Sequence, residues 1–315
     1  MLIAILSIIG GLIILTLGAE GLVRGSASVA LRLGIAPLVV GLTIVAFGTG
    51  SPELVVSIQA ALSKSSGIAL GNVIGSNISN IALILGMAAI VRPMAVRVGI
   101  IKREIPIMIA VTAFLWLLLY DGNLSRFDGI ILTIGSIIYP IFAYRTSKQK
   151  ETKEVEEEFE EAFEPSKKSV WLDIVYIVAG LVPLVIGANV LLSGAITIAK
   201  QFGISEVVIG LTIIAIGTSL PELATSVVAA LKNESDIAFG NAIGSNVFNI
   251  LGVLGLTAMI QPISAAEIRP LDMSVMLGSG VLLWFLLGRR FILDRFEGFL
   301  LLIGYAIYIY TLIPQ

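Results

Sequence analysis

Two glutamates occupy matching positions in apolar segments of the chain, and each follows a proline. Glu53 ends the run Gly48-Thr-Gly-Ser-Pro-Glu53, and Glu222 ends the run Gly217-Thr-Ser-Leu-Pro-Glu222. An ionisable residue in the middle of a membrane costs roughly 2.5–3.5 kcal/mol on insertion scales. Two such costs at equivalent positions favour coordination of a cation over the alternative, a pair of protonated glutamates that only pack.

The prolines weaken the helix in front of each glutamate. Pro52 and Pro221 have no N–H to donate, and their rings crowd the carbonyls of Gly48 and Gly217, four residues earlier. We therefore expect each helix to break there and to leave backbone oxygens without intrahelical partners. Within a membrane such oxygens need another partner, and a cation is one candidate. A plain proline kink is the alternative.

The next apolar segment of each half carries polar side chains at intervals of four residues, hence on one face of a helix. These are Asn72, Ser76 and Asn80 in the first half, and Asn241, Ser245 and Asn249 in the second. We expect Ser76, Asn80, Ser245 and Asn249 to contribute to the site. We expect interhelical amide hydrogen bonds from Asn72, Asn77, Asn241 and Asn246. Small residues should bring these helices against the broken ones: Gly71, Gly75, Gly240 and Gly244.

Together these groups offer oxygen ligands only. Calcium takes six to eight oxygens in flexible geometry, whereas magnesium holds its water tightly and softer metals recruit His, Cys or Met. The chain has no Cys and no His, which excludes disulfides, thiol chemistry and imidazole ligands. Two ionised glutamates balance one divalent ion, and several monovalent ions could occupy the same oxygens. Mutually exclusive occupancy of this kind is the physical basis of antiport.

The elements that position these residues are predicted to be membrane-spanning helices. The 315 residues are 57% hydrophobic and only 13% charged, against about 25% charged in soluble domains. Ten apolar stretches are long enough, or nearly so, to cross a bilayer. They cover residues 2–23, 37–62, 67–91, 104–120, 127–145, 171–192, 206–231, 237–260, 273–288 and 294–313. We therefore predict an all-α polytopic membrane protein with ten transmembrane helices.

The chain repeats itself, and residues 1–146 align with residues 170–315 without a gap. Each repeat holds five apolar stretches, and because five is odd, the second repeat should enter the membrane from the opposite side. The sequence thus predicts two inverted five-helix repeats, 1–146 and 170–315. The linker between them, 147–169, is rich in glutamate and reads as a solvated spacer. A calcium-sensing role is conceivable, but no EF-hand spacing supports it.

The distribution of positive charge predicts the orientation in the membrane. If the linker is cytoplasmic, 16 of the 20 lysines and arginines fall in cytoplasmic segments. We therefore expect a multi-pass protein of the cell membrane with both termini outside the cytoplasm. The partners expected are the lipid bilayer and the transported ions, with no nucleic acid and no obligate protein partner.

The paired motifs around Glu53 and Glu222, with Gly71-Asn-Val-Ile-Gly-Ser-Asn77 and Gly240-Asn-Ala-Ile-Gly-Ser-Asn246, resemble the two α-repeats of the sodium/calcium exchanger family. The resemblance spans nearly the whole chain and is strongest to prokaryotic members. It implies ten helices, no enzymatic activity, no cofactor, and exchange of Na⁺ for Ca²⁺ by alternating access, with helices 1 and 6 sliding past the core. The ions would bind at the midplane between the repeats.

The resemblance also implies roles for individual residues. Glu53 and Glu222 would be the carboxylates shared by Ca²⁺ and Na⁺, and the carbonyls of Thr49 and Thr218 would complete the calcium shell. The implied Na⁺ ligands are Ala46, Ser76, Ala215, Ser219 and Ser245, and the residues facing the central position are Asn80 and Asn249.

The chain departs from the family at two of these positions. Gly50 stands where serine is usual, so that one Na⁺ subsite either loses a hydroxyl or is completed by water. Asn249 stands where potassium-dependent relatives have aspartate, so no K⁺ requirement is expected. Two alternatives stay open: a proton/calcium antiporter, in which protonation of the glutamates replaces Na⁺, and a cation channel.

Overall fold

The structure is a computed structural model that describes residues 2–33, 37–148, 170–201 and 215–312. Within these ranges, eight helices are long and apolar enough to cross a membrane, or nine if a bent pair near Glu53 counts as one span. The predicted span 206–231 lies partly outside the described residues, which contain its end as α13 (Leu220–Leu231). The all-α polytopic class is therefore confirmed, whereas the count of ten helices stays a prediction.

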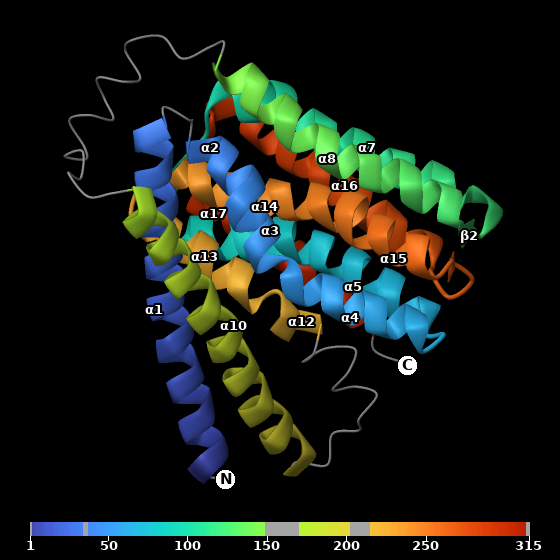
Figure 1. Ribbon diagram of the computed structural model, residues 1–315, viewed down its shortest axis with the longest axis horizontal. Helices are drawn as coiled ribbons and strands as arrows, with labels where there is room; N and C mark the ends of the chain where they lie inside the picture. Colours follow the sequence, from blue (N-terminus) through green and yellow to red (C-terminus); the bar gives the residue numbers. More distant parts are fainter. Residues whose placement is uncertain (1, 34–36, 149–169, 202–214, 313–315) are drawn as a thin grey trace.

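Helices α1 (Leu2–Leu33) and α10 (Val170–Gln201) continue beyond the predicted apolar stretches. Each has 32 residues and is about 48 Å long at 1.5 Å per residue, against a hydrocarbon core of about 30 Å. The parts of these helices that are apolar enough to cross a membrane, Leu2–Ser26 and Ile174–Leu191, agree with the predicted stretches 2–23 and 171–192. Figure 1 shows the N-terminal end of α1 and the C-terminal end of α10 projecting beyond the other helices.

Helices α1 and α10 run antiparallel and in close contact. A Cβ added to Gly11 would lie 2.5 Å from the backbone nitrogen of Leu191, and one added to Gly180 would lie 2.4 Å from that of Leu22. When the two repeats are aligned, Gly11 falls on Gly180 and Leu22 falls on Leu191, so these two contacts are equivalent. The repeats are thus related by an approximate two-fold axis that inverts one relative to the other, as predicted.

The polar helices form the centre of the molecule. The spans that contain α5 (Ser66–Ser79) and α14 (Ser235–Phe248) are 78% and 83% buried, against at most 39% for the other spans. The first span continues through η2 (Asn80–Leu85) and α6 (Gly86–Val91), and the second through η6 (Asn249–Leu254) and α15 (Gly255–Ile260). Short elements of both repeats pack around them: α2 (Pro37–Val40), η1 (Gly41–Val45), α3 (Ala46–Thr49), α4 (Ser51–Leu62), α12 (Ala215–Thr218) and α13.

The remaining helices lie outside this core. They are η3 (Ile100–Glu104), α7 (Ile105–Leu118), η4 (Leu119–Asp121), α8 (Arg126–Lys148), α16 (Pro270–Arg290) and α17 (Arg295–Leu312). Figure 1 shows α7, α8 and α16 along one side of the molecule, where α7 packs against α16 and α8 packs against α15 and η6. Many of their large apolar side chains are exposed, as suits contact with lipid.

Two short antiparallel strand pairs connect the repeats. Strand β1 (Met94–Ala95) pairs with β4 (Ile292–Leu293), and β2 (Asn123–Leu124) pairs with β3 (Ile263–Ser264). Each pair joins one strand from each repeat, and alignment of the repeats converts one pair into the other. The strand pairs therefore obey the same two-fold relation as α1 and α10.

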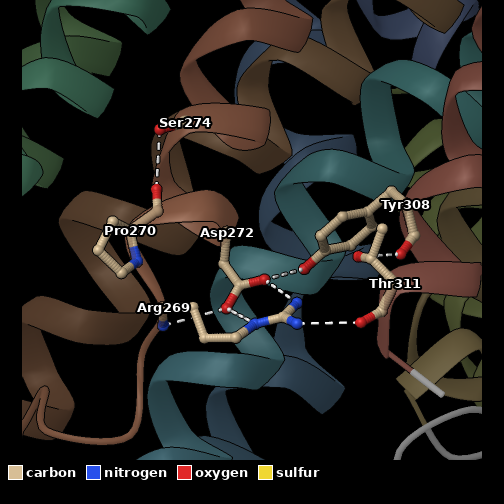
Figure 2. A network of polar contacts seen from close by, with 6 residues as sticks. All are labelled: Arg269, Pro270, Asp272, Ser274, Tyr308 and Thr311. Carbon is tan, nitrogen blue, oxygen red and sulfur yellow. Dashed lines mark hydrogen bonds and ion pairs between the residues drawn. The ribbon is translucent and has the colours of Figure 1, made fainter. Parts of the chain in front are cut away.

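A polar network that centres on the buried Asp272 joins α16 to α17 (Figure 2). The guanidinium of Arg269 binds both oxygens of Asp272, at 3.1 and 2.6 Å, and the hydroxyl of Tyr308 donates to Asp272 at 3.1 Å. In the first repeat, Tyr139 occupies the position equivalent to Tyr308 and donates to Glu104 at 2.9 Å. Each outer pair of helices is thus held by a tyrosine–carboxylate hydrogen bond, which the sequence pattern did not reveal.

Candidate ion-binding site

Both helices that carry the glutamates are broken at the predicted place. Helices α3 and α4 meet at Gly50 with a bend of 45°. Helices α12 and α13 are separated by Ser219. Glu53 and Glu222 lie in the first turns of α4 and α13, where the N-terminal end of a helix favours negative charge. The break therefore places each carboxylate at a helix start in the interior of the protein.

Amide side chains of the central helices hold the broken helices in position. The side-chain nitrogen of Asn72 donates to the backbone carbonyl of Glu53 at 3.2 Å. That of Asn241 donates to the carbonyl of Glu222 at 3.3 Å. Each asparagine also bonds to a serine hydroxyl one turn further along the same broken helix, at 3.0 Å. The predicted interhelical role of these two asparagines is confirmed.

A reciprocal set of amide bonds joins α5 to α14. Asn77 donates to the backbone carbonyl of Asn246, and Asn246 donates to that of Asn77, both at 3.2 Å. Asn80 donates to Oδ1 of Asn246 at 2.9 Å, and Asn249 donates to Oδ1 of Asn77 at 3.1 Å. The structural role predicted for Asn77 and Asn246 is confirmed, and their amides also orient Asn80 and Asn249.

Close backbone contact brings the central and broken helices together. A Cβ added to Gly240 would lie 2.7 Å from the carbonyl oxygen of Leu38, and one added to Gly244 would lie 2.6 Å from Cα of Leu42. Both glycines therefore pack as predicted. The segments equivalent to Leu38 and Leu42 in the second repeat, near 207 and 211, lie outside the described residues, and so does the predicted packing of Gly71 and Gly75 against them.

The two glutamates are buried and close to each other. Glu53 is 0% exposed and Glu222 is 1% exposed, and the two carboxylates are near enough to interact electrostatically. The hydroxyl of Ser219 donates to Oε1 of Glu53 at 3.4 Å and lies 3.2 Å from the hydroxyl of Ser76. Groups from both repeats therefore converge on one carboxylate.

Six buried oxygen atoms of the predicted site residues have no hydrogen-bond partner among the described residues. They are Oε2 of Glu53, Oε1 and Oε2 of Glu222, Oδ1 of Asn80 and of Asn249, and Oγ of Ser245. Buried polar atoms in folded proteins are nearly always bonded, so such a group requires an explanation. Five of the six are pure acceptors, and a cation would satisfy them together.

The formal charge of this site comes from two carboxylates. Among the described residues, no three acidic side chains lie close enough to share a metal ion. The other candidate ligands are neutral amide, hydroxyl and carbonyl oxygens. One divalent ion would therefore neutralise the site when both glutamates are ionised.

The remaining predicted site residues lie on the short helices before the breaks. Thr49 is 1% exposed and its hydroxyl bonds to Oδ1 of Asn241 at 3.1 Å. Among the described residues, no backbone N–H bonds to the Thr49 carbonyl across the break. Ala46 and Thr218 are buried as well. Ala215 is the first residue of α12, and its side chain lies outside the described part of the structure.

One feature of the site was not expected from the sequence. The central helices change from α to π geometry at Asn80 and at Asn249, which begin η2 and η6. Single π turns within α-helices occur frequently at functional sites. Apolar periodicity gives no sign of them, because a π turn inserts one residue into a helix that is buried on all sides.

These features define the class of protein: a polytopic membrane protein with buried, unpartnered oxygen atoms enclosed between two inverted halves. A model of the family described as sodium/calcium exchanger protein matches residues 3–145 and 172–313. The chain therefore belongs to the sodium/calcium exchanger family, whose members are membrane transporters and not enzymes.

Individual relatives match along their whole length. The chain is 40% identical to CaxA of Alkalimonas amylolytica over 99% of both chains. It is 31% identical to the sodium/calcium exchanger MaX1 of Methanosarcina acetivorans over 96% of both. Among solved structures, the sodium-calcium exchanger NCX_Mj superposes with a TM-score of 0.85, at 33% identity, over 99% of both chains.

Proposed function

We propose that this protein exchanges Na⁺ for Ca²⁺ across the cell membrane by alternating access. The observation that carries the proposal is the group of six unpartnered buried oxygens around Glu53 and Glu222. Such a group is costly unless ions occupy it. The likeness to MaX1 and to NCX_Mj, which are named as sodium/calcium exchangers, supports the choice of ions.

The proposed ligands are those that the resemblance implied. Glu53 and Glu222 serve both ions, the carbonyls of Thr49 and Thr218 contribute to Ca²⁺, and Asn80 and Asn249 face the centre. The resemblance implies Ala46, Ser76, Ala215, Ser219 and Ser245 as further Na⁺ ligands. Because the same carboxylates serve both ions, occupancy by Ca²⁺ excludes Na⁺. The empty site carries two negative charges, and ion binding must neutralise them before the helices slide, so the two ions cross in opposite directions.

Reconstitution into proteoliposomes tests the coupling ion. Vesicles loaded with Na⁺ and diluted into Na⁺-free medium should accumulate ⁴⁵Ca²⁺, and an equal concentration of K⁺ inside should not support uptake. Uptake driven by a pH gradient but not by Na⁺ would show a proton/calcium antiporter instead. Calcium flux that needs no counter-ion would show a channel.

We propose the orientation that the positive charges predict, with repeats 1–146 and 170–315 joined by a cytoplasmic linker. The chain has no native cysteine, so a single introduced cysteine reports on which side of the membrane its position lies. A cysteine in place of Tyr120, which is 91% exposed at the end of η4, should react with an impermeant maleimide added to intact cells. A cysteine in place of Arg290 should react only after permeabilisation. The reverse pattern would contradict the orientation.

Helices α1 and α10 are the proposed moving elements. They contact each other closely through glycines and project from the core (Figure 1). Their outer faces expose large apolar side chains, including Leu6, Leu17 and Val182. A pair of helices in contact mainly with lipid and with each other can slide against the core without breaking the amide bonds that hold the site.

A further inference from the structure

The two halves of the ion site differ at one pair of equivalent positions. Ser219 separates α12 from α13, and Gly50 separates α3 from α4. The other polar residues of the site recur in both repeats: Thr49 with Thr218, Glu53 with Glu222, Ser76 with Ser245, and Asn80 with Asn249. The hydroxyl of Ser219 has no equivalent in the first repeat.

Glycine is not required at position 50 by the backbone. Gly50 has φ −80° and ψ 1°, and Ser219 has φ −87° and ψ 6°. Both conformations are open to any L-residue. The reason for glycine therefore lies in what surrounds it.

An aromatic ring occupies the space beside Gly50. A Cβ added to Gly50 would lie 3.0 Å from Cδ1 of Phe248 and 3.0 Å from the carbonyl oxygen of Ala46. The ring of Phe248 also packs on that of Phe47, with centroids 4.4 Å apart. The position equivalent to Phe248 in the first repeat is the small residue Ser79. Glycine at 50 and phenylalanine at 248 therefore form a matched pair.

This pair removes a ligand from the half of the site that contains Glu222. Ser219 contacts Oε1 of Glu53 and Oγ of Ser76. By the two-fold relation, a hydroxyl at position 50 would contact Glu222 and Ser245. Both carboxylate oxygens of Glu222 and the hydroxyl of Ser245 have no hydrogen-bond partner among the described residues, so no described side chain takes the place of a hydroxyl at position 50.

We infer that the Gly50–Phe248 pair eliminates one Na⁺ position beside Glu222, so that of these two equivalent positions only the one formed by Glu53, Ser76 and Ser219 binds Na⁺. A dehydrated monovalent cation needs oxygens in place of its hydration shell. The hydroxyl of Ser219 supplies one beside Glu53, whereas on the Glu222 side the phenyl ring of Phe248 packs beside Gly50. Calcium binding between the two carboxylates is retained. This inference rests on the proposed function and sets how many Na⁺ ions compete with one Ca²⁺.

The test is the Na⁺ dependence of equilibrium ⁴⁵Ca²⁺ binding to the purified full-length protein. The slope of log apparent Kd for Ca²⁺ against log Na⁺ concentration gives the number of Na⁺ ions that displace one Ca²⁺ at saturating competition. The double variant Gly50→Ser/Phe248→Ser restores the second-repeat pattern. Its slope should exceed that of the wild type by one, which is about a further tenfold weakening of Ca²⁺ binding per tenfold rise in Na⁺.

Two further variants keep the inference falsifiable if the double variant does not fold. Ser219→Gly copies the first-repeat pattern and should lower the slope by one. Phe248→Ser alone makes room without adding a ligand at position 50 and should leave the slope unchanged. An unchanged slope in Ser219→Gly, or in a folded Gly50→Ser/Phe248→Ser, would overturn the inference. Failure of Na⁺ to displace Ca²⁺ from the wild type would instead overturn the proposed Na⁺ coupling.

Discussion

The hydroxyl of Ser219, in the second repeat, donates to Oε1 of Glu53, in the first, over a distance of 3.4 Å. This bond crosses between the halves of the molecule at the point where both of their helices are broken. Any movement that separates the halves near the site must therefore change the environment of a buried carboxylate.

Replacement of either glutamate by glutamine should abolish exchange. Glu53→Gln or Glu222→Gln removes one of the two formal charges that balance a divalent ion, while the amide fills the same volume. Calcium uptake in Na⁺-loaded proteoliposomes should fall to the background of empty vesicles, and the elution of the protein in size-exclusion chromatography should not change. Transport retained by Glu53→Gln would remove that residue from the mechanism.

The amide pair at the centre should contribute to stability. Asn77→Ala removes the bond to the carbonyl of Asn246 and leaves the side-chain nitrogen of Asn249 without its acceptor. We expect a loss of about 1–3 kcal/mol, typical of a buried polar group left unsatisfied, seen as a lower melting temperature in detergent. Asn189→Ala is the matched control, because Asn189 is exposed and bonds only to the previous turn of its own helix. Equal effects of the two substitutions would contradict this role.

The contact between α1 and α10 should not accept a side chain at Gly11, whereas a side chain at the neighbouring Gly10 should have little effect. Gly11→Val places carbon where a Cβ would already lie 2.5 Å from the backbone of Leu191, whereas no described atom lies within 4 Å of a Cβ at Gly10. Gly11→Val should therefore reduce transport at least tenfold or prevent folding, and Gly10→Val should leave both near the wild type. The measurement is the rate of ⁴⁵Ca²⁺ uptake per mole of purified protein for each of the two variants.

Loss of the tyrosine hydroxyl in the network of Figure 2 should weaken the attachment of α17. Tyr308→Phe removes a hydrogen bond of 3.1 Å to the charged Asp272, and such bonds contribute about 1.5–3 kcal/mol. Thermal unfolding should occur at a lower temperature, with calcium exchange unchanged at temperatures where the protein is folded. Tyr310→Phe, at a position that is 66% exposed on the same helix, should unfold like the wild type.

One acidic residue in the turn before α14 should make stability fall with rising pH. Burial, and secondly the neighbouring Asp236, raise the pKa of Glu234 to about 7, although Arg97 and Lys232 act in the opposite direction. Between about pH 4.5 and pH 7 the unfolded chain loses this proton while the folded protein keeps it, so the contribution of Glu234 to stability decreases through that window.

Glu234→Gln removes this dependence. The variant should melt at a higher temperature than the wild type at pH 8, and the difference should shrink towards zero at pH 4.5. The measurement is the melting temperature of both proteins between pH 4.5 and pH 8 in one detergent. A difference that is constant with pH would show that ionisation of Glu234 is not responsible.

The sequence was sufficient to predict the two helix breaks because the repeat acts as an internal control. A proline before a glutamate is ambiguous alone, but its recurrence at Pro52 and Pro221 identified both breaks. The intervals of four residues in Asn72, Ser76 and Asn80 placed one polar face correctly, since helical periodicity is a local property.

Other features depend on tertiary contacts that no local pattern encodes. The pairing of Tyr308 with Asp272 joins two helices whose polar residues look like ordinary helix ends in the sequence. The π turn that begins at Asn80 is set by packing on all sides of the central helix. Helices α1 and α10 continue beyond their apolar stretches because their last turns contain small and polar residues, which form helix without being apolar.

Binding of Ca²⁺ between the two glutamates is tested most directly by a crystal structure of the protein grown in the presence of Sr²⁺, a strongly scattering substitute for Ca²⁺. We expect an anomalous difference peak between the carboxylates of Glu53 and Glu222, within direct coordination distance of both, and we expect the peak to be absent in Glu53→Gln. A peak elsewhere, with none between the two carboxylates, would contradict binding at this site.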